Sequence, residues 1–429
     1  MRLTRPLALL CLCCLVSSAY AAPERKARGV VLFIGDGMGI ATVTAARIHK
    51  GFLAGTRPPA AARLNLDRAP RSCLVQTWSA DNIVTDSAAS MTAMVTGVKV
   101  INGALAARAT ATGGIEKLMT LLEIAESRGL STGVVTTTSV THGTPAATYA
   151  HILKRGDQAA ITAALVPGVD NPRLGDGIEV VLGGGRSHFI ARPAVLEALS
   201  SAGYHRVETA QALEKAVAGG AGKILGLFAE LDLEFAAQRA SRAPQQPTLA
   251  QMTRAALEVL RRDPRGYFLV VEGGRIDHAH HMNNSYLAIG EMLAFDEALG
   301  VAVDSMGDDD VFFVTADHDH TMVIAGYAPV SQDVFSQAGG DANGDPYATL
   351  LYADGPGALK KPPASLPSAE VPAADRIDRA GVPLEWETHA GMDVPLYVFA
   401  PPAVRNDLPA SIDNTEIFRR LRSAILAIE

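Results

Sequence analysis

The sequence has little positive charge and few cysteines, which excludes two broad classes of protein. Its 429 residues carry 38 Lys and Arg against 45 Asp and Glu, a formal charge of -7. A nucleic-acid or anionic-membrane binder needs a basic face, so neither function is expected. Of the four cysteines, three lie within residues 11–14, and only Cys73 lies beyond them. Internal disulfides are therefore not expected, and the hydrophobic core and bound metals are left to stabilise the fold.

Long apolar runs are also scarce, and the one at the N-terminus has the form of an export signal. Two arginines precede the run 7–16, and the small residues of Ala19-x-Ala21 follow it. The run is too short to cross a bilayer, which argues against a membrane anchor. We therefore predict a signal peptide over residues 1–21 and an exported mature chain, 22–429, that is periplasmic or secreted. Cleavage would remove two arginines and no acid, which changes the formal charge from -7 to -9.

Short apolar runs alternate with helical patterns along the rest of the chain. Uninterrupted runs of strand length, typical of buried parallel strands, occur at 29–34, 132–136, 178–182, 267–271, 311–315 and 396–399. Helical patterns occur between them at 116–126 and 286–303, with a shorter one at 91–95. This alternation predicts an α/β fold, a three-layer α/β/α sandwich with a mostly parallel central sheet.

Two stretches interrupt the alternation. Residues 326–388 are rich in Gly, Pro, Asp and Ser, and we expect them to form a small loop-rich insertion that rests on the main domain. Residues 236–248 are polar, and we expect them to be a surface connection.

Acidic and imidazole side chains gather where the predicted strands end, at the edge where α/β sheets bind ligands. They are Asp36, His142, Thr144, Glu272, Asp277, His281, Asp317 and His318, with His389 just before the last strand. Taken singly, each has an ordinary alternative, such as a turn residue for Asp36 or a helix cap for Asp277. Taken together, like charges at one sheet edge repel strongly, so cations are expected among them.

The spacing and chemistry of these residues indicate which cations they suit. Asp277 and His281 are four residues apart, on one face of a helical turn, and Asp317 and His318 are adjacent at a strand end. Mixed nitrogen and oxygen ligands without thiolate favour zinc. Glu272 and Thr144 offer only oxygen, which favours magnesium.

Ser87 stands at the start of a helical pattern, directly after Asp86. The ordinary interpretation of Asp86-Ser87 is a helix N-cap. The functional interpretation adds that backbone N–H groups and the helix dipole at that end suit a phosphate. A metal nearby would lower the pKa of the Ser87 hydroxyl and make it a nucleophile.

These motifs together closely resemble the alkaline phosphatase family, in its animal-type pattern. The resemblance runs from about Arg28 to Pro402 and preserves the family's order. The motifs are 33–39 (FIGDGMG), 85–90 (TDSAAS), 142–146 (HGTPA), 272–281 (EGGRIDHAHH), 315–318 (TADH) and 388–391 (THAG). His142 and His278 mark the animal-type branch, because the enterobacterial branch has Asp and Lys there.

The resemblance implies two zinc ions and one magnesium ion. It assigns Asp277, His281 and His389 to the first zinc. It assigns Asp36, Asp317 and His318 to the second. Asp36, Thr144 and Glu272 would complete the magnesium site.

The resemblance also implies roles for residues around the ions. Ser87 would face the second zinc as the nucleophile, and Arg155 would clamp the phosphate. His278 would contribute to substrate binding, and it and His142 would lie beside the metal ligands without touching the ions. The 326–388 insertion resembles the family's crown lobe, and a homodimer is possible.

The motif set supports hydrolysis of phosphate monoesters, with broad specificity and a phosphoserine intermediate on Ser87. A relative that acts on phosphodiesters or sulfate esters is one alternative. A non-catalytic phosphate or metal scavenger is the other. Ser87 and Arg155 favour the monoester.

Overall fold

The centre of the molecule is one large sheet. The computed structural model describes residues 28–168, 171–359 and 375–428, so the predicted signal peptide lies outside them. The strands of the sheet are β1 (Gly29–Gly35), β2 (Arg71–Gln76), β5 (Ser131–Ser139), β6 (Val180–Gly184), β7 (His205–Val207), β8 (Ile224–Leu227), β9 (Tyr267–Gly273), β10 (Val311–Thr315), β18 (Val394–Phe399) and β19 (Ser411–Asp413). They lie in the order β19-β2-β18-β10-β1-β9-β5-β6-β8-β7.

The sheet is mostly parallel, as predicted. Every neighbouring pair from β10 to β7 is parallel, and β18 runs antiparallel to both β10 and β2. All six predicted apolar runs are strands, although β6 starts at Val180 rather than at residue 178. All residues of β1 and β9 are buried, which explains their uninterrupted apolar sequence.

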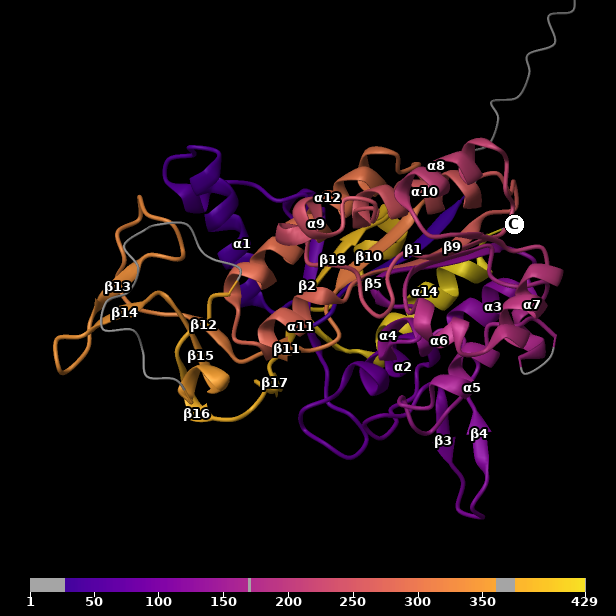
Figure 1. Ribbon diagram of the computed structural model, residues 1–429, viewed down its shortest axis with the longest axis horizontal. Coiled ribbons are helices and arrows are strands. Elements are labelled where there is room, and N and C mark those ends of the chain that lie inside the picture. The colour runs from indigo at the N-terminus through magenta and orange to yellow at the C-terminus, as the bar shows by residue number, and fades with distance from the viewer. Residues whose placement is uncertain (1–27, 169–170, 360–374, 429) are drawn as a thin grey trace, which may run out of the picture.

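Helices cover both faces of the sheet, which confirms the three-layer prediction (Figure 1). On one face, α10 packs on β5 and α12 on β1; on the other, α3 packs on β5 and α14 on β1. The α-helices are α1 (Ile40–Leu53), α2 (Ser87–Thr96), α3 (Leu121–Ser127), α4 (Gly143–Ala146), α5 (Gln158–Ala163), α6 (Arg186–Ile190), α7 (Pro193–Ser201), α8 (Ala210–Ala218), α9 (Ala236–Arg242), α10 (Leu249–Leu260), α11 (Arg275–His281), α12 (Ser285–Asp304), α13 (Pro402–Arg405) and α14 (Thr415–Leu426). Short 3-10 helices cover Pro59–Ala61, Leu66–Arg68, Pro172–Leu174 and Pro356–Ala358.

The helix predicted at 116–126 is wrong in its first half. Residues 116 and 117 belong to β4 (Ile115–Lys117), which forms a hairpin with β3 (Ala107–Ala109), and α3 starts only at Leu121. A capping box sets that start, because Thr120 and Glu123 each accept a hydrogen bond from the backbone N–H of the other.

The other helical expectations fare differently. The pattern at 286–303 is confirmed by α12. The surface connection expected at 236–248 is wrong in part, because its first half is α9 and the side chain of Arg239 is buried there.

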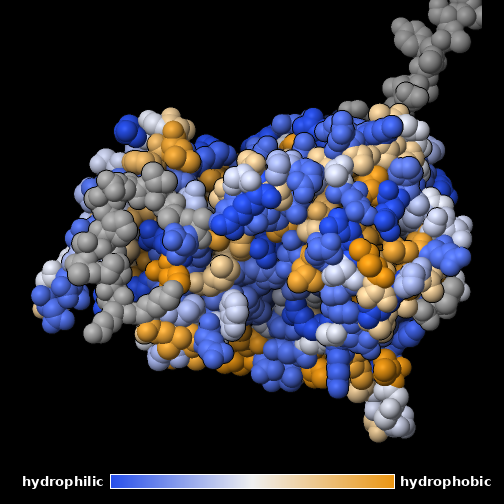
Figure 2. All heavy atoms as spheres, in the orientation of Figure 1, coloured by the Kyte–Doolittle hydropathy of each residue, from blue (hydrophilic) through white to orange (hydrophobic). Residues whose placement is uncertain are grey.

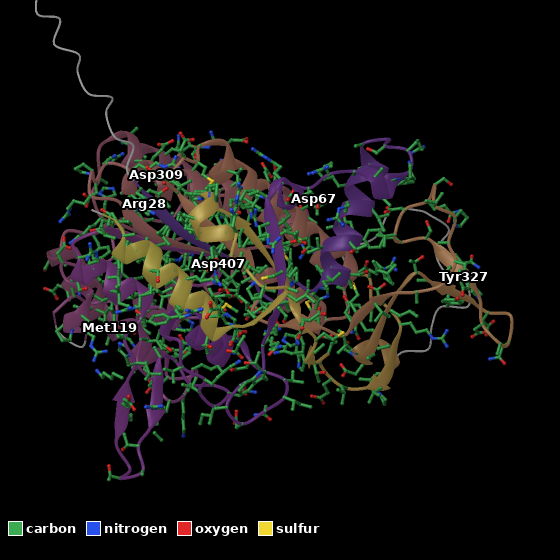
Figure 3. The ribbon with its side chains drawn as sticks, turned by 180° about the vertical axis from the view of Figure 1, so that it is seen from behind. Arg28, Asp67, Met119, Asp309, Tyr327 and Asp407 are labelled. Carbon is green, nitrogen blue, oxygen red and sulfur yellow. The ribbon has the colours of Figure 1, made fainter. Side chains whose placement is uncertain are left out.

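Small sheets extend from one end of the central sheet. Their strands are β11 (Asp319–His320), β12 (Met322–Ile324), β13 (Gln337–Gly340), β14 (Pro346–Ala348), β15 (Leu350–Gly355), β16 (Ala380–Pro383) and β17 (His389–Ala390). Figure 3 places Tyr327 at this end, far from Arg28 and Asp309, which lie side by side at the other. Figure 2 shows hydrophilic residues over the region where these strands meet the main body.

Candidate metal centre and nucleophile

The topology of the sheet explains why distant residues meet. Strand β1 pairs in parallel with both β9 and β10, and Ile34 is in register with Glu272 and with Thr315. Asp36 and Asp317, two residues after Ile34 and Thr315, therefore leave the sheet at the same edge. Strand β18 runs the opposite way, so its start lies at this edge too, and His389 precedes it.

The first group of predicted ligands is Asp277, His281 and His389. Asp277 Oδ1 lies 3.2 Å from His281 Nε2 and 3.3 Å from His389 Nε2. Each ring donates its Nδ1–H to a carbonyl oxygen, His281 to Glu387 at 2.5 Å and His389 to Thr85 at 2.9 Å. A carbonyl can only accept, so Nε2 of each neutral ring carries a lone pair. Two lone pairs and a carboxylate facing one another suit a metal ion.

The second group is Asp36, Asp317 and His318, all completely buried. Nε2 of His318 lies 3.3 Å from Asp36 Oδ1 and 3.4 Å from Asp317 Oδ2. Both oxygens of Asp36 and Oδ2 of Asp317 are buried without a hydrogen-bond partner among the described residues. Because an unpaired buried carboxylate is costly, these orphaned atoms also fit a cation.

The third group surrounds Asp36 on its other side. Oγ1 of Thr144 and Oε1 of Glu272 are buried and have no partner in the described part of the chain. The other oxygen of Glu272 accepts hydrogen bonds from Thr136 and from Thr138, the latter at 3.2 Å. His142 also belongs here, because one of its ring nitrogens, an oxygen of Asp36 and an oxygen of Glu272 lie within 4.8 Å of one another.

The electrostatics of the cluster favour the binding of cations. Burial first, and then the charges of Asp317, Asp277 and Glu272, raise the pKa of Asp36 well above its usual value. Burial raises the pKa of Glu272 to about 7. Burial also opposes ionisation of Asp277, but His281, His320 and His389 hold its pKa well below the usual range. Cations bound among these carboxylates would offset the free-energy cost of ionising Asp36 and Glu272.

Ser87 is the first residue of α2 and faces the second group. Its Oγ lies 3.4 Å from His318 Nε2, and the residue is almost fully buried. The preceding Asp86 caps the helix by accepting a hydrogen bond from the backbone N–H of Ala89 at 2.9 Å. The N-cap interpretation of Asp86-Ser87 is therefore confirmed, and the place of Ser87 at the N-terminus of α2 is compatible with the functional interpretation.

Arg155 reaches the same place from another segment. Its Nη1 donates to Asp86 Oδ2 at 2.9 Å, and its Nη2 donates to His142 Nε2 at 2.9 Å. Asp86 therefore both caps the helix of Ser87 and holds Arg155 beside it. The His142 and His278 rings stand at right angles, with centroids 5.4 Å apart.

The structure adds two residues that the sequence did not assign. His320 Nε2 lies 2.8 Å from Asp277 Oδ1, and His320 pairs with His389 in the β11–β17 ladder. Glu387 accepts from Nδ1 of His320 at 2.5 Å. A usable signal was the Asp-His-Asp-His run 317–320, whose second histidine lies two residues after a predicted ligand.

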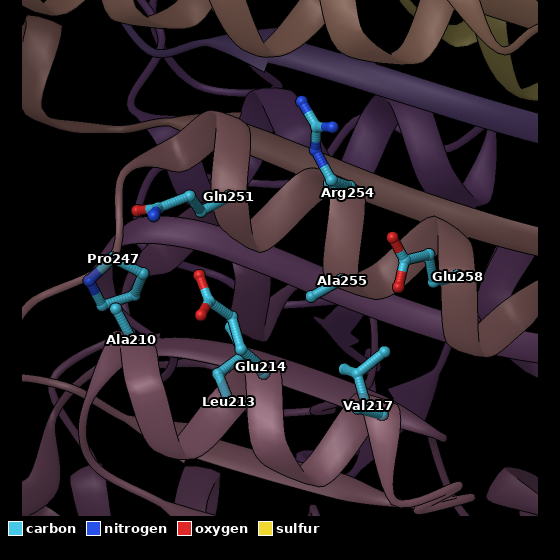
Figure 4. A pocket seen from close by; sticks show the side chains of 10 residues that line it. Ala210, Leu213, Glu214, Val217, Pro247, Gln251, Arg254, Ala255 and Glu258 are labelled. Carbon is cyan, nitrogen blue, oxygen red and sulfur yellow. The ribbon is translucent and has the colours of Figure 1, made fainter.

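Several cavities of this protein lie away from the polar cluster. One of about 410 Å³ opens between α8 and α10 (Figure 4). Its lining includes Leu213, Val217 and Arg254, and it shares no residue with the polar cluster. The chemistry of this protein therefore lies at the sheet edge and not in that cavity.

A buried hydroxyl at a helix N-terminus, beside carboxylates and imidazoles at the carboxyl edge of a parallel sheet, is the arrangement of an α/β metalloenzyme. The family model for alkaline phosphatase matches residues 27–427. The chain therefore belongs to the alkaline phosphatase family. It is a metal-dependent enzyme that hydrolyses phosphate monoesters.

Relatives and solved structures agree with this assignment. The chain is 33% identical to an alkaline phosphatase of Gadus morhua over 425 residues, covering 89% of this chain and 88% of that protein. It is 32% identical to the human tissue-nonspecific isozyme over 429 residues, covering 88% and 80%. The alkaline phosphatase structure from Thermus thermophilus has a TM-score of 0.71 at 24% identity, covering 94% and 92%. That from the Antarctic bacterium TAB5 has a TM-score of 0.67 at 22% identity, covering 94% and 98%.

The described residues also bear on membrane insertion. Among them, no helix combines the length and the apolar character needed to cross a bilayer.

Proposed function

We propose that Ser87 is the nucleophile of this phosphatase and carries a phosphoserine intermediate. The position of its hydroxyl carries the proposal: Oγ is 3.4 Å from His318 Nε2, at the N-terminus of α2 and next to the residue that holds Arg155. Ser87 Oγ loses its proton to solvent and attacks phosphorus while the bond to the ester oxygen breaks, and the leaving alcohol takes a proton from solvent. Water then attacks the phosphoserine, which releases inorganic phosphate and restores the hydroxyl.

Two zinc ions and one magnesium ion are the cations that we assign to the cluster. Asp277, His281 and His389 form one zinc site, and Asp36, Asp317 and His318 form the other. The magnesium site has Asp36, Thr144 and Glu272. When bound, these ions supply Lewis acidity that activates the hydroxyl and water and neutralises the charge on the phosphate. The orphaned oxygens of Asp36, Thr144, Glu272 and Asp317 support these sets.

The third site has support from a relative. Variants of the TAB5 enzyme in which a histidine is replaced by glutamate or aspartate were solved with magnesium bound in a site called M3. By analogy, a third site in this fold can hold magnesium. Here it has His142 within ligand distance of Asp36 and Glu272.

Arg155 binds the phosphoryl group in this proposal. Its guanidinium is part-exposed and already fixed by Asp86 and His142, so it loses little side-chain entropy when it binds a phosphate. The backbone N–H groups at the start of α2 add positive potential for the same oxygens. His278 contributes to the binding of the substrate from the side of Asp277.

The remaining proposals concern the chain as a whole. We propose that residues 1–21 are a signal peptide, that the mature enzyme is exported to the periplasm or secreted, and that 22–429 form one catalytic domain. Within it, 326–388 form the crown-like insertion. A homodimer is one possible assembly, and broad specificity follows if the site contacts little beyond the phosphate.

Replacement of the nucleophile tests the central proposal. Ser87→Ala should abolish turnover of p-nitrophenyl phosphate and the phosphorylated peptide seen by mass spectrometry after rapid quenching. Its metal content and thermal unfolding should match the wild type. Ser90→Ala, one turn further along α2, is the control and should keep the phosphopeptide. Wild-type turnover in Ser87→Ala would reject the assignment.

A substrate panel separates the proposal from its alternatives. We expect turnover of p-nitrophenyl phosphate to exceed that of the bis-ester and of the sulfate by orders of magnitude, because Arg155 and α2 are arranged for a group with several free anionic oxygens. A preference for the diester or the sulfate would favour the first alternative. Stoichiometric phosphate binding without turnover would favour a scavenger.

A further inference from the structure

Arg275 is the first residue of α11 and lies behind the metal cluster, where it contacts His278. Its Nη1 is 2.9 Å from Nδ1 of His278. A guanidinium has donors and no acceptor, so Nδ1 must accept this hydrogen bond with its lone pair. In the neutral ring the proton therefore sits on Nε2.

Arg275 is itself held in place from two sides. Its guanidinium carbon lies 3.8 Å from the centroid of the Phe235 ring, a stacking distance. Asp232 Oδ2 lies 3.5 Å from Nη1 of Arg275, and Asp232 Oδ1 accepts a hydrogen bond from the backbone N–H of Ser139 at 2.9 Å. Phe235 packs in turn against Ala279 on the helix that carries both Arg275 and His278.

Asp232 is a nearby group that competes for Nδ1 of His278. A carboxylate would favour the tautomer with a proton on Nδ1, but its Oδ2 is 3.6 Å away, beyond a hydrogen bond. Arg275 is 0.7 Å closer and aligned by Phe235. The contact with Arg275 therefore decides the tautomer.

The tautomer determines what His278 can do at the site. Its Nε2 lies 4.0 Å from Asp277 Oδ2, on the side of the zinc ligands. With a proton there, Nε2 donates to an anionic oxygen and cannot bind a metal. The other tautomer would point a lone pair at the Asp277 carboxylate and at an incoming phosphate, and both contacts would be repulsive.

We propose that Arg275 is a positioning residue for catalysis, which fixes His278 as the Nε2–H tautomer and so presents one hydrogen-bond donor to the phosphate or to a water bound to it. Asp232 and Phe235 hold the guanidinium of Arg275 in this position. The role of Arg275 toward substrate rests on the proposed function, because that function places the phosphate next to His278. The tautomer itself does not depend on it.

Arg275→Met in the metal-loaded enzyme tests the proposal, because methionine keeps an unbranched, flexible stem and removes every donor. In wild-type protein labelled with 15N-histidine, two-bond 1H–15N correlation spectra should show His278 as the Nε2–H tautomer, assigned by comparison with His278→Ala. The variant should lose this signature. Its KM for p-nitrophenyl phosphate and its inhibition constant for inorganic phosphate should rise at least roughly tenfold, as for the loss of one hydrogen bond to an anion. The kcat should change less than KM.

The matched control is Arg420→Met, an arginine of similar burial on α14 that pairs with Asp407 and Glu416. It should leave the His278 spectrum and KM unchanged. Arg275→Lys restores a donor group, and its KM should lie between those of Arg275→Met and the wild type. A purely steric role of Arg275 would not predict this. Arg275→Lys also serves as the test variant if Arg275→Met does not fold.

A double variant shows whether Arg275 acts through His278. In the His278→Ala background, Arg275→Met should raise KM no further. An equal rise in both backgrounds, or an unchanged His278 tautomer in Arg275→Met, would overturn the positioning role. A changed tautomer with unchanged KM would instead reject His278 as a phosphate contact, which is a failure of the proposed function of that residue.

Discussion

Glu387 and His320 form a buried pair in which Nδ1 of the imidazole donates to the carboxylate across 2.5 Å. The opposite nitrogen of His320 is 2.8 Å from Asp277, and the backbone carbonyl of Glu387 accepts from His281 at 2.5 Å. Glu387, just before β17, thus orients two of the imidazoles that face Asp277, those of His281 and His320. It also connects the end of the 326–388 segment to the first zinc site that we propose.

We therefore expect Glu387→Gln to weaken metal retention more than chemistry. Loss of a group that orients a ligand typically costs 10- to 100-fold in metal affinity. The measurement is the half-life of activity in excess chelator, together with kcat at saturating zinc, which should stay near that of the wild type. Glu385→Gln, an exposed site two residues away, is the control. An unchanged half-life would contradict a role for Glu387 in holding the site.

Arg155→Lys should weaken phosphate binding. Lysine is a point charge and cannot hold Asp86, His142 and a phosphate at once, as the guanidinium fork can. We expect the inhibition constant of inorganic phosphate to rise at least roughly tenfold, equivalent to ~1.4 kcal/mol. Competitive inhibition assays measure it. Arg173→Lys, on a part-exposed side chain near Glu123, should show no such change.

Removal of the metals should destabilise the fold and change its pH dependence. Without cations the buried carboxylates repel, and the raised pKa of Asp36 means that the folded apo-protein binds protons that the unfolded chain releases. The stability of the apo-protein should therefore fall as pH rises from acid to alkaline. Scanning calorimetry should show a Tm at least roughly 5 °C lower after chelation, restored by zinc.

A variant of Asp36 shows whether the lower Tm of the apo-protein comes from repulsion between the buried carboxylates or only from the loss of the bound metals. Asp36→Asn should raise the Tm of the apo-protein at alkaline pH, although it removes activity from the metal-loaded enzyme. A lower apo Tm for Asp36→Asn would contradict the repulsion.

Glu126 offers a test of stability far from the active site. Burial raises its pKa to about 8, with a hydrogen bond from Thr132 as the main opposing effect. The folded state therefore binds a proton that the unfolded chain has lost, and stability falls as pH rises from about 4.5 toward 8.

Glu126→Gln should remove this loss and stabilise the protein above pH 8 by an amount on the order of a few kcal/mol, at about 1.4 kcal/mol per pKa unit. The side-chain oxygen of glutamine can still accept from Thr132. Urea unfolding at pH 6 and pH 9 measures the difference, with the exposed Glu197→Gln as control. Equal stability of variant and wild type at pH 9 would contradict the raised pKa.

Much of the fold could be predicted because burial leaves a simple record in the sequence. The strands β1, β9 and β10 are covered on both faces, so their residues are apolar without alternation, and their bounds were close to the prediction. The start of α3 was missed because a local capping box outweighed a helical pattern that continued upstream through 116–120. The helix α9 was missed because its sequence is polar, and a polar sequence gives no indication that Arg239 is buried.

The sequence by itself determined the kinds of ligand and their place at strand ends, since apolar runs and the residues that follow them are local properties. It did not determine which of these side chains face one another, or the pairing of His320 with Glu387. Those depend on contacts between segments that are far apart in the sequence. For example, the antiparallel strand β18 brings His389 to the edge of the sheet, next to His281, which is 108 residues away. Only the tertiary structure decides them, because hydrogen-bond direction and ligand geometry depend on distances that no local pattern encodes.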